Sequence, residues 1–250
     1  MCIARPSRRR FLAGNVLAPA LLATGCSPPL PVSEGEAARM GREAWTEIRA
    51  RTPTSTSREA AALVGRASAR LLEAAGEDPR DWEIATFAGD TVNAFALPGN
   101  RIGVYEGMLR LAADEARLAA VIGHEIGHVA ADHSRERMSA EVAGNAAVRF
   151  VAWLLDWGEV EFADEIAGAL GVGLEFGVLR PYGRGQEEEA DLLGLDLMAR
   201  AGYPPDAAVE LWERMDARGR GGFEFLSTHP APASRIETLR EAIAARASVR

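Results

Sequence analysis

The chain has 250 residues, a hydrophobic content of 48% and a formal net charge of −8. This length and apolar content suffice for one large domain or two small ones with a buried core, and they exclude an intrinsically disordered chain. The acidic balance argues against nucleic acid as a partner. Both cysteines, Cys2 and Cys26, lie near the N-terminus, so we expect the folded body to contain no disulfide.

Residues 1–25 have the composition of an export signal. Four arginines precede an apolar stretch that ends in small residues just before Cys26. The arginines resemble a twin-arginine motif, and the last residues before the cysteine resemble a bacterial lipobox. We therefore expect 1–25 to be a signal peptide, Cys26 to carry a lipid and 26–34 to form a proline-rich tether. A plain secretory signal and an uncleaved anchor are the alternatives. The expected location is the bacterial cell envelope, at the outer membrane facing the periplasm.

The remaining chain, 35–250, is expected to form a single domain that is mainly α-helical with a small β-sheet. Apolar periodicity and turn residues predict helices in 34–50, 58–75, 113–136, 185–201, 206–215 and 233–245, and strands in 82–87, 91–96 and 101–105. Asp206 is expected to be an N-cap. The sheet either presents an edge strand to an extended substrate or only covers the core. Residues 139–180 are apolar but interrupted by charges, which predicts a helical hairpin and not a membrane span.

The stretch His124-Glu125-Ile126-Gly127-His128 is an HExxH sequence within the predicted helix 113–136. Residues four apart lie on one face of a helix, so His124 and His128 are placed to share a divalent cation. Glu125 beside them can accept a proton from the attacking water. This combination is typical of hydrolytic metalloenzymes.

A catalytic zinc site usually has a third protein ligand. The metzincin extension fails, because Ala131 and Ser134 stand where that pattern has glycine and histidine. A thermolysin-like extension fails as well, because Ala147 stands where the glutamate belongs. His133 is one residue away from the metzincin position, and we interpret it as a helix-end residue and not a ligand.

The helix predicted for 185–201 offers the missing carboxylate. Glu187, Asp191 and Gly194 fall on one of its faces, and the glycine permits another helix to come close. We expect Glu187 to reach the metal and Asp191 to hold a ligand histidine. The alternative is a solvated acidic helix N-terminus, favoured by the helix dipole.

HEIGH, a later E-x-x-A-D and the T-H-P at 228–230 together resemble the M48 family of zinc metallopeptidases, and in particular its bacterial lipoprotein branch. The resemblance covers roughly 35–245, including 93–99 and 104–109. It implies a zincin-like domain with an HExxH helix and a later ExxAD helix. It also implies one Zn²⁺ per chain. It assigns His124, His128 and Glu187 as metal ligands and Glu125 as general base. It assigns Asp191 as the carboxylate that holds a ligand histidine by a hydrogen bond.

The resemblance adds two residues near the metal. It implies that His229 either stabilises the oxyanion or occupies the fourth zinc position and holds the enzyme inactive. It implies that Arg235 is a further candidate for stabilising the oxyanion. The two roles of His229 stay open at this point.

We therefore predict a zinc-dependent metalloendopeptidase of the cell envelope that degrades misfolded or mislocalised envelope proteins. The alternative is a zinc-stabilised holdase for outer-membrane proteins with little turnover. Glu125 argues against the holdase, because a structural metal site needs no general base. A hydrolase of non-peptide bonds is a weaker third candidate. Contact with a membrane is expected through the lipid at Cys26, and the sequence predicts no oligomeric state.

Overall fold

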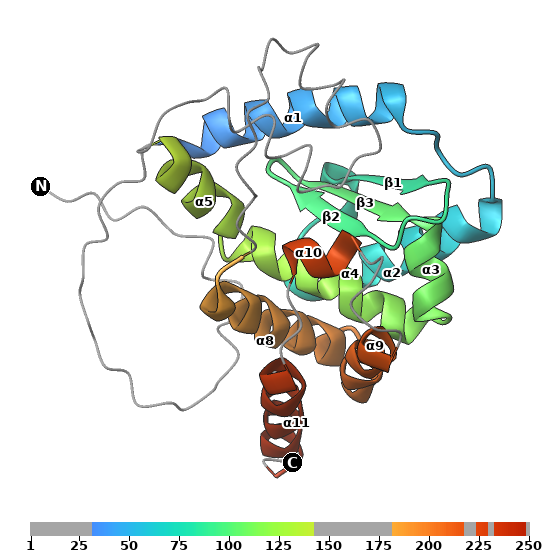
Figure 1. Ribbon diagram of the computed structural model, residues 1–250, viewed down its shortest axis with the longest axis vertical. Helices are drawn as coiled ribbons and strands as arrows, with labels where there is room; N and C mark the ends of the chain where they lie inside the picture. Colours follow the sequence, from blue (N-terminus) through green and yellow to red (C-terminus); the bar gives the residue numbers. More distant parts are fainter. Residues whose placement is uncertain (1–31, 143–181, 218–223, 230–232, 249–250) are drawn as a thin grey trace, which may run out of the picture.

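The computed structural model describes residues 32–142, 182–217, 224–229 and 233–248. The predicted signal peptide, Cys26, residues 26–31 of the tether and most of the 139–180 hairpin lie outside the described residues. The described chain is mainly α-helical with one small sheet, which confirms the predicted fold class (Figure 1). Among the described residues, no helix is both long enough and apolar enough to cross a membrane.

The elements lie along the chain in an order close to the predicted one. They are α1 (Glu34–Arg51), α2 (Arg58–Ala75), the 3₁₀ turn η2 (Pro79–Asp81), β1 (Glu83–Phe87), β2 (Ala94–Leu97), β3 (Arg101–Tyr105), α3 (Glu106–Ala112), α4 (Glu115–Ala130), α5 (His133–Val142), α8 (Arg184–Arg200), α9 (Asp206–Ala217), α10 (Glu224–Thr228) and α11 (Ala233–Ala247). Helices α3 and α10 were not predicted. Asp206 is the first residue of α9, so its prediction as the N-cap is wrong by one position.

The three strands pair in the order β1-β3-β2, with β1 parallel and β2 antiparallel to the central β3. Alternate side chains of a strand point to opposite faces. On one face, aromatic rings of the sheet pack against Trp45 of α1, which lies across the sheet in Figure 1. On the other face, Ile102 and Val104 join the core that includes α2 and α4. Strand β2 is therefore an edge strand with a buried set of side chains.

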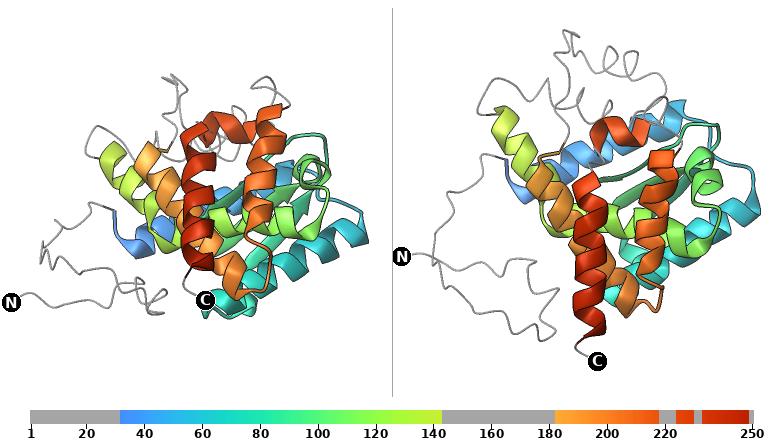
Figure 2. Two further views of the ribbon diagram at one scale, coloured as in Figure 1. Left: turned by 90° about the horizontal axis from the view of Figure 1, so that it is seen from below. Right: turned by 60° about the horizontal axis from the view of Figure 1, so that its bottom comes forward.

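Helix α4 lies in the middle of the fold, between the sheet and α8 (Figure 1). Every residue from Leu118 to His128 is buried. Glycines allow α4 and α8 to approach closely, as the sequence predicted for Gly194: a Cβ on Gly194 would lie 2.8 Å from the Gly123 carbonyl carbon, and one on Gly127 would lie 2.7 Å from the Ala190 oxygen. Helix α9 packs on α4, and α11 packs on both α8 and α9 (Figure 2). This packing brings the HExxH residues against the acidic residues of α8.

The prediction of one helix over 113–136 is wrong. Helix α4 ends at Ala130, and Asp132 adopts a left-handed conformation with φ of 61°. A new helix, α5, then begins at His133 and runs toward the start of α1, where the Val32 N–H donates to Ser139 Oγ at 3.2 Å. A single left-handed residue stops a right-handed helix, and Asp accepts this conformation more readily than most residues.

Candidate metal centre

Four buried side chains converge at the middle of α4. His124 and His128 come from α4, Glu187 comes from the first turn of α8, and His229 directly follows α10. One nitrogen or oxygen atom of each lies within 4.8 Å of the other three. The structure thus brings together the three predicted ligands and the histidine whose role the sequence left open.

The distances between these atoms fit a tetrahedral cation site. Nε2 of His124 lies 3.0 Å from Nε2 of His128 and 3.2 Å from Nδ1 of His229. The Glu187 carboxylate lies 3.0 Å from Nδ1 of His229 and 3.5 Å from Nε2 of each α4 histidine. Zinc bonds of about 2.0–2.1 Å place tetrahedral ligand atoms about 3.3–3.4 Å apart. The donor set therefore fits Zn²⁺, and Nδ1 of His229 would be a fourth donor, at the position that a catalytic zinc site keeps open.

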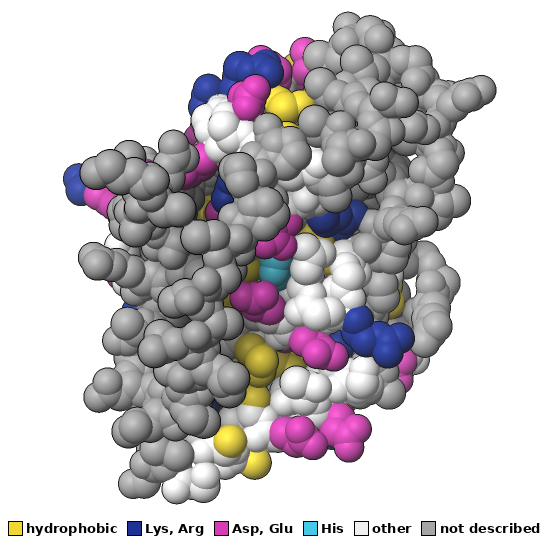
Figure 3. Space-filling model, turned by 90° about the vertical axis from the view of Figure 1, so that its left-hand side faces the viewer, with side chains coloured by type: hydrophobic (Ala, Val, Ile, Leu, Met, Phe, Trp, Pro, Cys, Tyr) yellow, Lys and Arg dark blue, Asp and Glu magenta, His cyan; other side chains and the backbone are white. Residues whose placement is uncertain are grey.

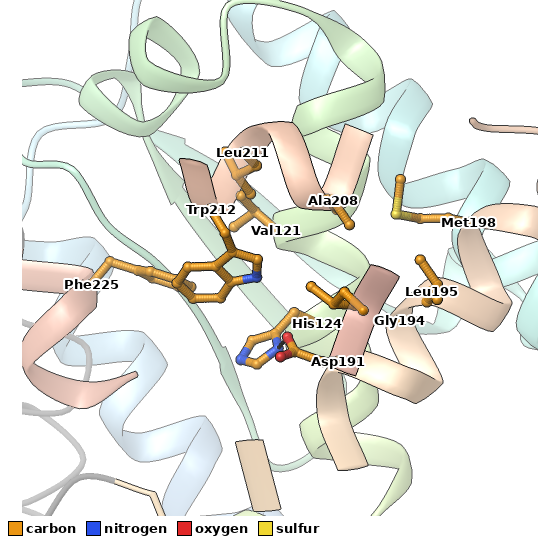
Figure 4. Close-up of a pocket in the computed structure, with 12 residues that line it drawn as sticks. Val121, His124, Asp191, Gly194, Leu195, Met198, Ala208, Leu211, Trp212 and Phe225 are labelled. Atoms are coloured by element: carbon orange, nitrogen blue, oxygen red, sulfur yellow. Dashed lines mark hydrogen bonds and ion pairs between the residues drawn. The ribbon is translucent and has the colours of Figure 1, made fainter. Parts of the chain in front are cut away.

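Asp191 orients His124. Its Oδ1 lies 2.9 Å from Nδ1 of His124, so Nδ1 carries the proton and donates, and the lone pair on Nε2 faces the cluster. Figure 4 shows both side chains beside the small cavity behind the cluster, with the indole of Trp212 above the imidazole. The rings of Trp212 and Phe225 each lie with their centroids 6.2 Å from that of His124. Apolar walls thus enclose the side of the site away from β2.

Arg235 lies behind the carboxylates, with its side chain fully buried. Its Nε and Nη2 each donate to Asp191 at 2.7 Å, and its Nη1 forms an ion pair of 2.6 Å with Glu187 Oε2. The guanidinium also stacks on Trp212, 4.0 Å from the ring centroid. Every guanidinium nitrogen therefore faces a carboxylate that supports the cluster. A role of Arg235 toward an oxyanion stays a prediction.

The protonation states at the cluster suit a metal. Burial lowers the pKa of His124 and holds that of His128 well below its usual value, so both imidazoles are neutral. Burial opposes the charged form of Glu187, yet His229 and the hydrogen bond of His128 hold the pKa of that carboxyl well below its usual range. Neutral imidazoles and an ionised carboxylate are the forms that bind a divalent cation.

Glu125 is fully buried between α4 and the edge strand β2. Its Oε2 accepts a hydrogen bond of 3.1 Å from the Ala96 N–H. Its Oε1 has no hydrogen-bond partner among the described residues, and it lies 3.6 Å from Nε2 of His229. Burial raises the pKa of Glu125 to about 7. A cation bound at the cluster would lower this pKa again. A free carboxylate oxygen with a pKa in this range is suited to accept a proton at neutral pH.

The sequence did not reveal the surroundings of His128. Its Nδ1 lies 3.0 Å from Nδ1 of His133, and the ring of Tyr182 stacks on it with centroids 4.0 Å apart. His133 stays outside the four-atom cluster, in line with its interpretation as a residue that is not a ligand. Its buried contact with His128 was missed, because nothing in the sequence marks the left-handed Asp132 that creates it.

Comparison with known proteins gives a consistent result. The sequence profile described as peptidase family M48 matches residues 58–243. The mitochondrial metalloendopeptidase OMA1 of Schizosaccharomyces pombe is 39% identical over 181 residues, which are 71% of this chain and 51% of that protein. The protein of the same name from Saccharomyces cerevisiae is 35% identical over 68% of this chain and 52% of its own length. The β-barrel assembly-enhancing protease of Escherichia coli is 26% identical over 86% of this chain and 45% of its own length. The chain thus spans about half the length of these relatives.

Proposed function

The chain belongs to peptidase family M48, and from this membership we propose that it is a zinc-dependent metalloendopeptidase. One observation carries the proposal. A four-atom cluster with the spacing of tetrahedral zinc ligands lies directly beside a buried carboxylate oxygen, Glu125 Oε1, that has no hydrogen-bond partner in the described part of the chain. A purely structural zinc site would not require this second feature.

Residues around the cluster would have separate roles in peptide hydrolysis. Zinc, when bound, supplies the Lewis acid that polarises the scissile carbonyl and acidifies the attacking water. The Ala96 N–H holds Oε2 of Glu125, which leaves Oε1 free to accept the water proton and pass it to the leaving amine. If His229 were a fourth ligand, it would have to withdraw before substrate could reach a bound cation, and the described arrangement would be a closed form of the site. The alternative role of His229, at the oxyanion, would need no such withdrawal.

The substrate is a protein segment in extended conformation. Among the described residues, strand β2 pairs with β3 alone, and the Ala96 N–H donates to Glu125. A peptide added along this edge by main-chain hydrogen bonds would pass next to the cluster. The same strand also buries its four side chains in the core, so it both covers the core and borders the site.

Chelation is expected to abolish proteolysis. The purified protein loaded with zinc should cleave an unfolded substrate such as casein. We expect this because the proposed recognition uses main-chain hydrogen bonds, which any extended peptide can form. A chelator should remove this activity, and added Zn²⁺ should restore it. Cleavage that is unaffected by the chelator would contradict the zinc mechanism. Tight binding of casein without any cleavage by the zinc-loaded protein would favour the holdase.

We further propose that the protein acts in the bacterial cell envelope on misfolded or mislocalised envelope proteins, and that the lipid at Cys26 anchors it to the outer membrane. Two observations support this proposal. Residues 1–25 have the basic, apolar and small-residue regions of a lipoprotein signal. One relative is named a β-barrel assembly-enhancing protease, although the fungal relatives are named mitochondrial.

Replacement of the lipidated cysteine is expected to release the protein from membranes. Cys26→Ser removes the thiol that would carry the lipid, so the full-length variant expressed in a bacterial host should lose the label from a radioactive fatty acid. It should also leave the outer-membrane fraction and appear in the soluble fraction. Cys2→Ser is the matched control and should leave both the label and the fraction unchanged. Membrane association of Cys26→Ser equal to that of the unchanged protein would refute the anchor.

A further inference from the structure

We propose that His133 is a positioning residue: it holds the metal ligand His128 with its Nε2 facing the cation, and Glu189 holds His133 in turn. The proposal rests on the proposed function, because it concerns the same zinc site. It adds two residues that contribute no ligand atom to the cluster of described side chains. Both belong to segments, α5 and α8, that pack next to α4.

The contacts form a continuous chain that leads away from the cluster. Nε2 of His128 belongs to the cluster, and Nδ1 of the same ring lies 3.0 Å from Nδ1 of His133. Nε2 of His133 lies 3.4 Å from Oε2 of Glu189. The rings of His128 and His133 are buried, whereas the Glu189 side chain is 59% exposed. This series of contacts therefore begins at the metal ligand His128 and ends at the Glu189 carboxylate, which is in contact with solvent.

Coordination fixes the direction of these hydrogen bonds. A histidine that binds a metal through Nε2 has its lone pair there, so its proton resides on Nδ1 and is donated to a neighbour. Nδ1 of His133 is the neighbour of His128 and has to accept this proton. The neutral His133 ring then carries its own proton on Nε2, which faces the Glu189 carboxylate. Each nitrogen in this series of contacts thus has one role, and the tautomers of His128 and His133 are coupled to each other.

The two α4 ligands are supported unequally. The Nδ1 of His124 donates to Asp191, and that carboxylate is itself held by two hydrogen bonds from the buried Arg235. The corresponding partner of His128 is the neutral imidazole of His133, and not a carboxylate. Tyr182 stacks on the His128 ring and limits its tilt, but the stacked ring offers it no hydrogen-bond acceptor in this geometry. His133 is therefore the group that determines which nitrogen of His128 faces the metal.

The backbone between the two histidines makes the contact possible. In a continuous helix, a residue five positions after His128 would lie about 140° around the axis, on a different face. The left-handed Asp132 ends α4 and redirects the chain, so that His133 returns to the His128 ring. Figure 3 shows the side of the molecule where α5 and α8 lie, with a histidine visible between acidic side chains. A break in the HExxH helix thus serves the metal site directly.

Zinc affinity of the purified protein, measured by competition with a chromophoric chelator, tests the proposal. His133→Leu has nearly the volume of histidine but no acceptor, and we expect it to bind zinc 10- to 100-fold more weakly. His133→Asn places an amide oxygen near the position of Nδ1, and we expect it to restore affinity to within a few-fold of the unchanged protein. Glu189→Gln removes the charge and should give an intermediate loss. Glu188→Gln, the neighbouring carboxylate on α8, is the control and should leave the affinity unchanged.

Thermal unfolding of the metal-free proteins separates positioning from general packing. The proposal expects similar midpoints for the metal-free Leu and Asn variants, and a smaller rise on zinc addition for the Leu variant only. Equal losses of affinity in the Leu and Asn variants, or an unchanged affinity in His133→Leu, would overturn the positioning role while leaving the metallopeptidase proposal intact. Failure of the unchanged protein to bind zinc would refute the proposed function itself.

Discussion

Replacement of Glu125 by glutamine is expected to lower the rate of peptide cleavage roughly 10²- to 10⁴-fold, the range typical of general acid–base catalysis. The amide cannot accept the proton of the attacking water. It still offers an oxygen to the Ala96 N–H, which now donates to Glu125 Oε2. The variant should therefore fold normally. It should also keep its zinc, because Glu125 contributes no atom to the four-atom cluster.

The measurement is the initial rate of casein cleavage by zinc-loaded protein, together with the zinc content of each sample. Glu115→Gln is a matched control on the same helix, since ten residues of helix separate it from Glu125 by about 15 Å. Its partners are Tyr203 and two surface arginines, so the cleavage rate should be unchanged. A Glu125→Gln variant that retains both zinc and full turnover would refute the assignment of the base.

Replacement of Arg235 by methionine is expected to lower the free energy of unfolding of the metal-free protein by about 3–5 kcal/mol. The methionine side chain preserves most of the packing volume against Trp212. It leaves the buried carboxylates of Glu187 and Asp191 without the guanidinium that compensates them. Burial lowers the pKa of Arg235, but Asp191 and Glu187 raise it above its usual value, so the guanidinium stays charged beside both carboxylates.

Denaturant titration with and without zinc measures this effect. Zinc should recover part of the lost stability, because the cation compensates Glu187 but not Asp191. Arg240→Met is the matched control on α11: its exposed ion pair with Glu213 is worth about 0–1 kcal/mol. Arg235→Met with control-like stability and zinc affinity but a large loss of turnover would instead support the predicted role at the oxyanion.

The main elements of the fold could be predicted because they depend on local patterns. Helices α1 and α2 have the expected apolar periodicity and serine N-caps, and Ser33 forms a capping box with Glu36. The short strands were recognised from their aromatic and β-branched residues. Helix α3 was missed because it spans only Glu106–Ala112 and follows β3 without a break, which leaves too few residues for a periodic pattern. The break at Asp132 was missed because no glycine or proline marks it.

The sequence by itself determined the chemical identity of the site. His124 and His128 share a helix face because residues four apart always do, and Glu125 accompanies them in any helix with this sequence. The tertiary structure alone decided which distant groups complete the site. Asp191 and His229 lie 67 and 105 positions after His124, and such separations are bridged only by packing. The close contact of α4 with α8 brings Glu187 to the cluster, and the turn at Asp132 brings back His133. Helical spacing is fixed by covalent geometry, whereas the approach of distant segments depends on the burial of all their side chains together.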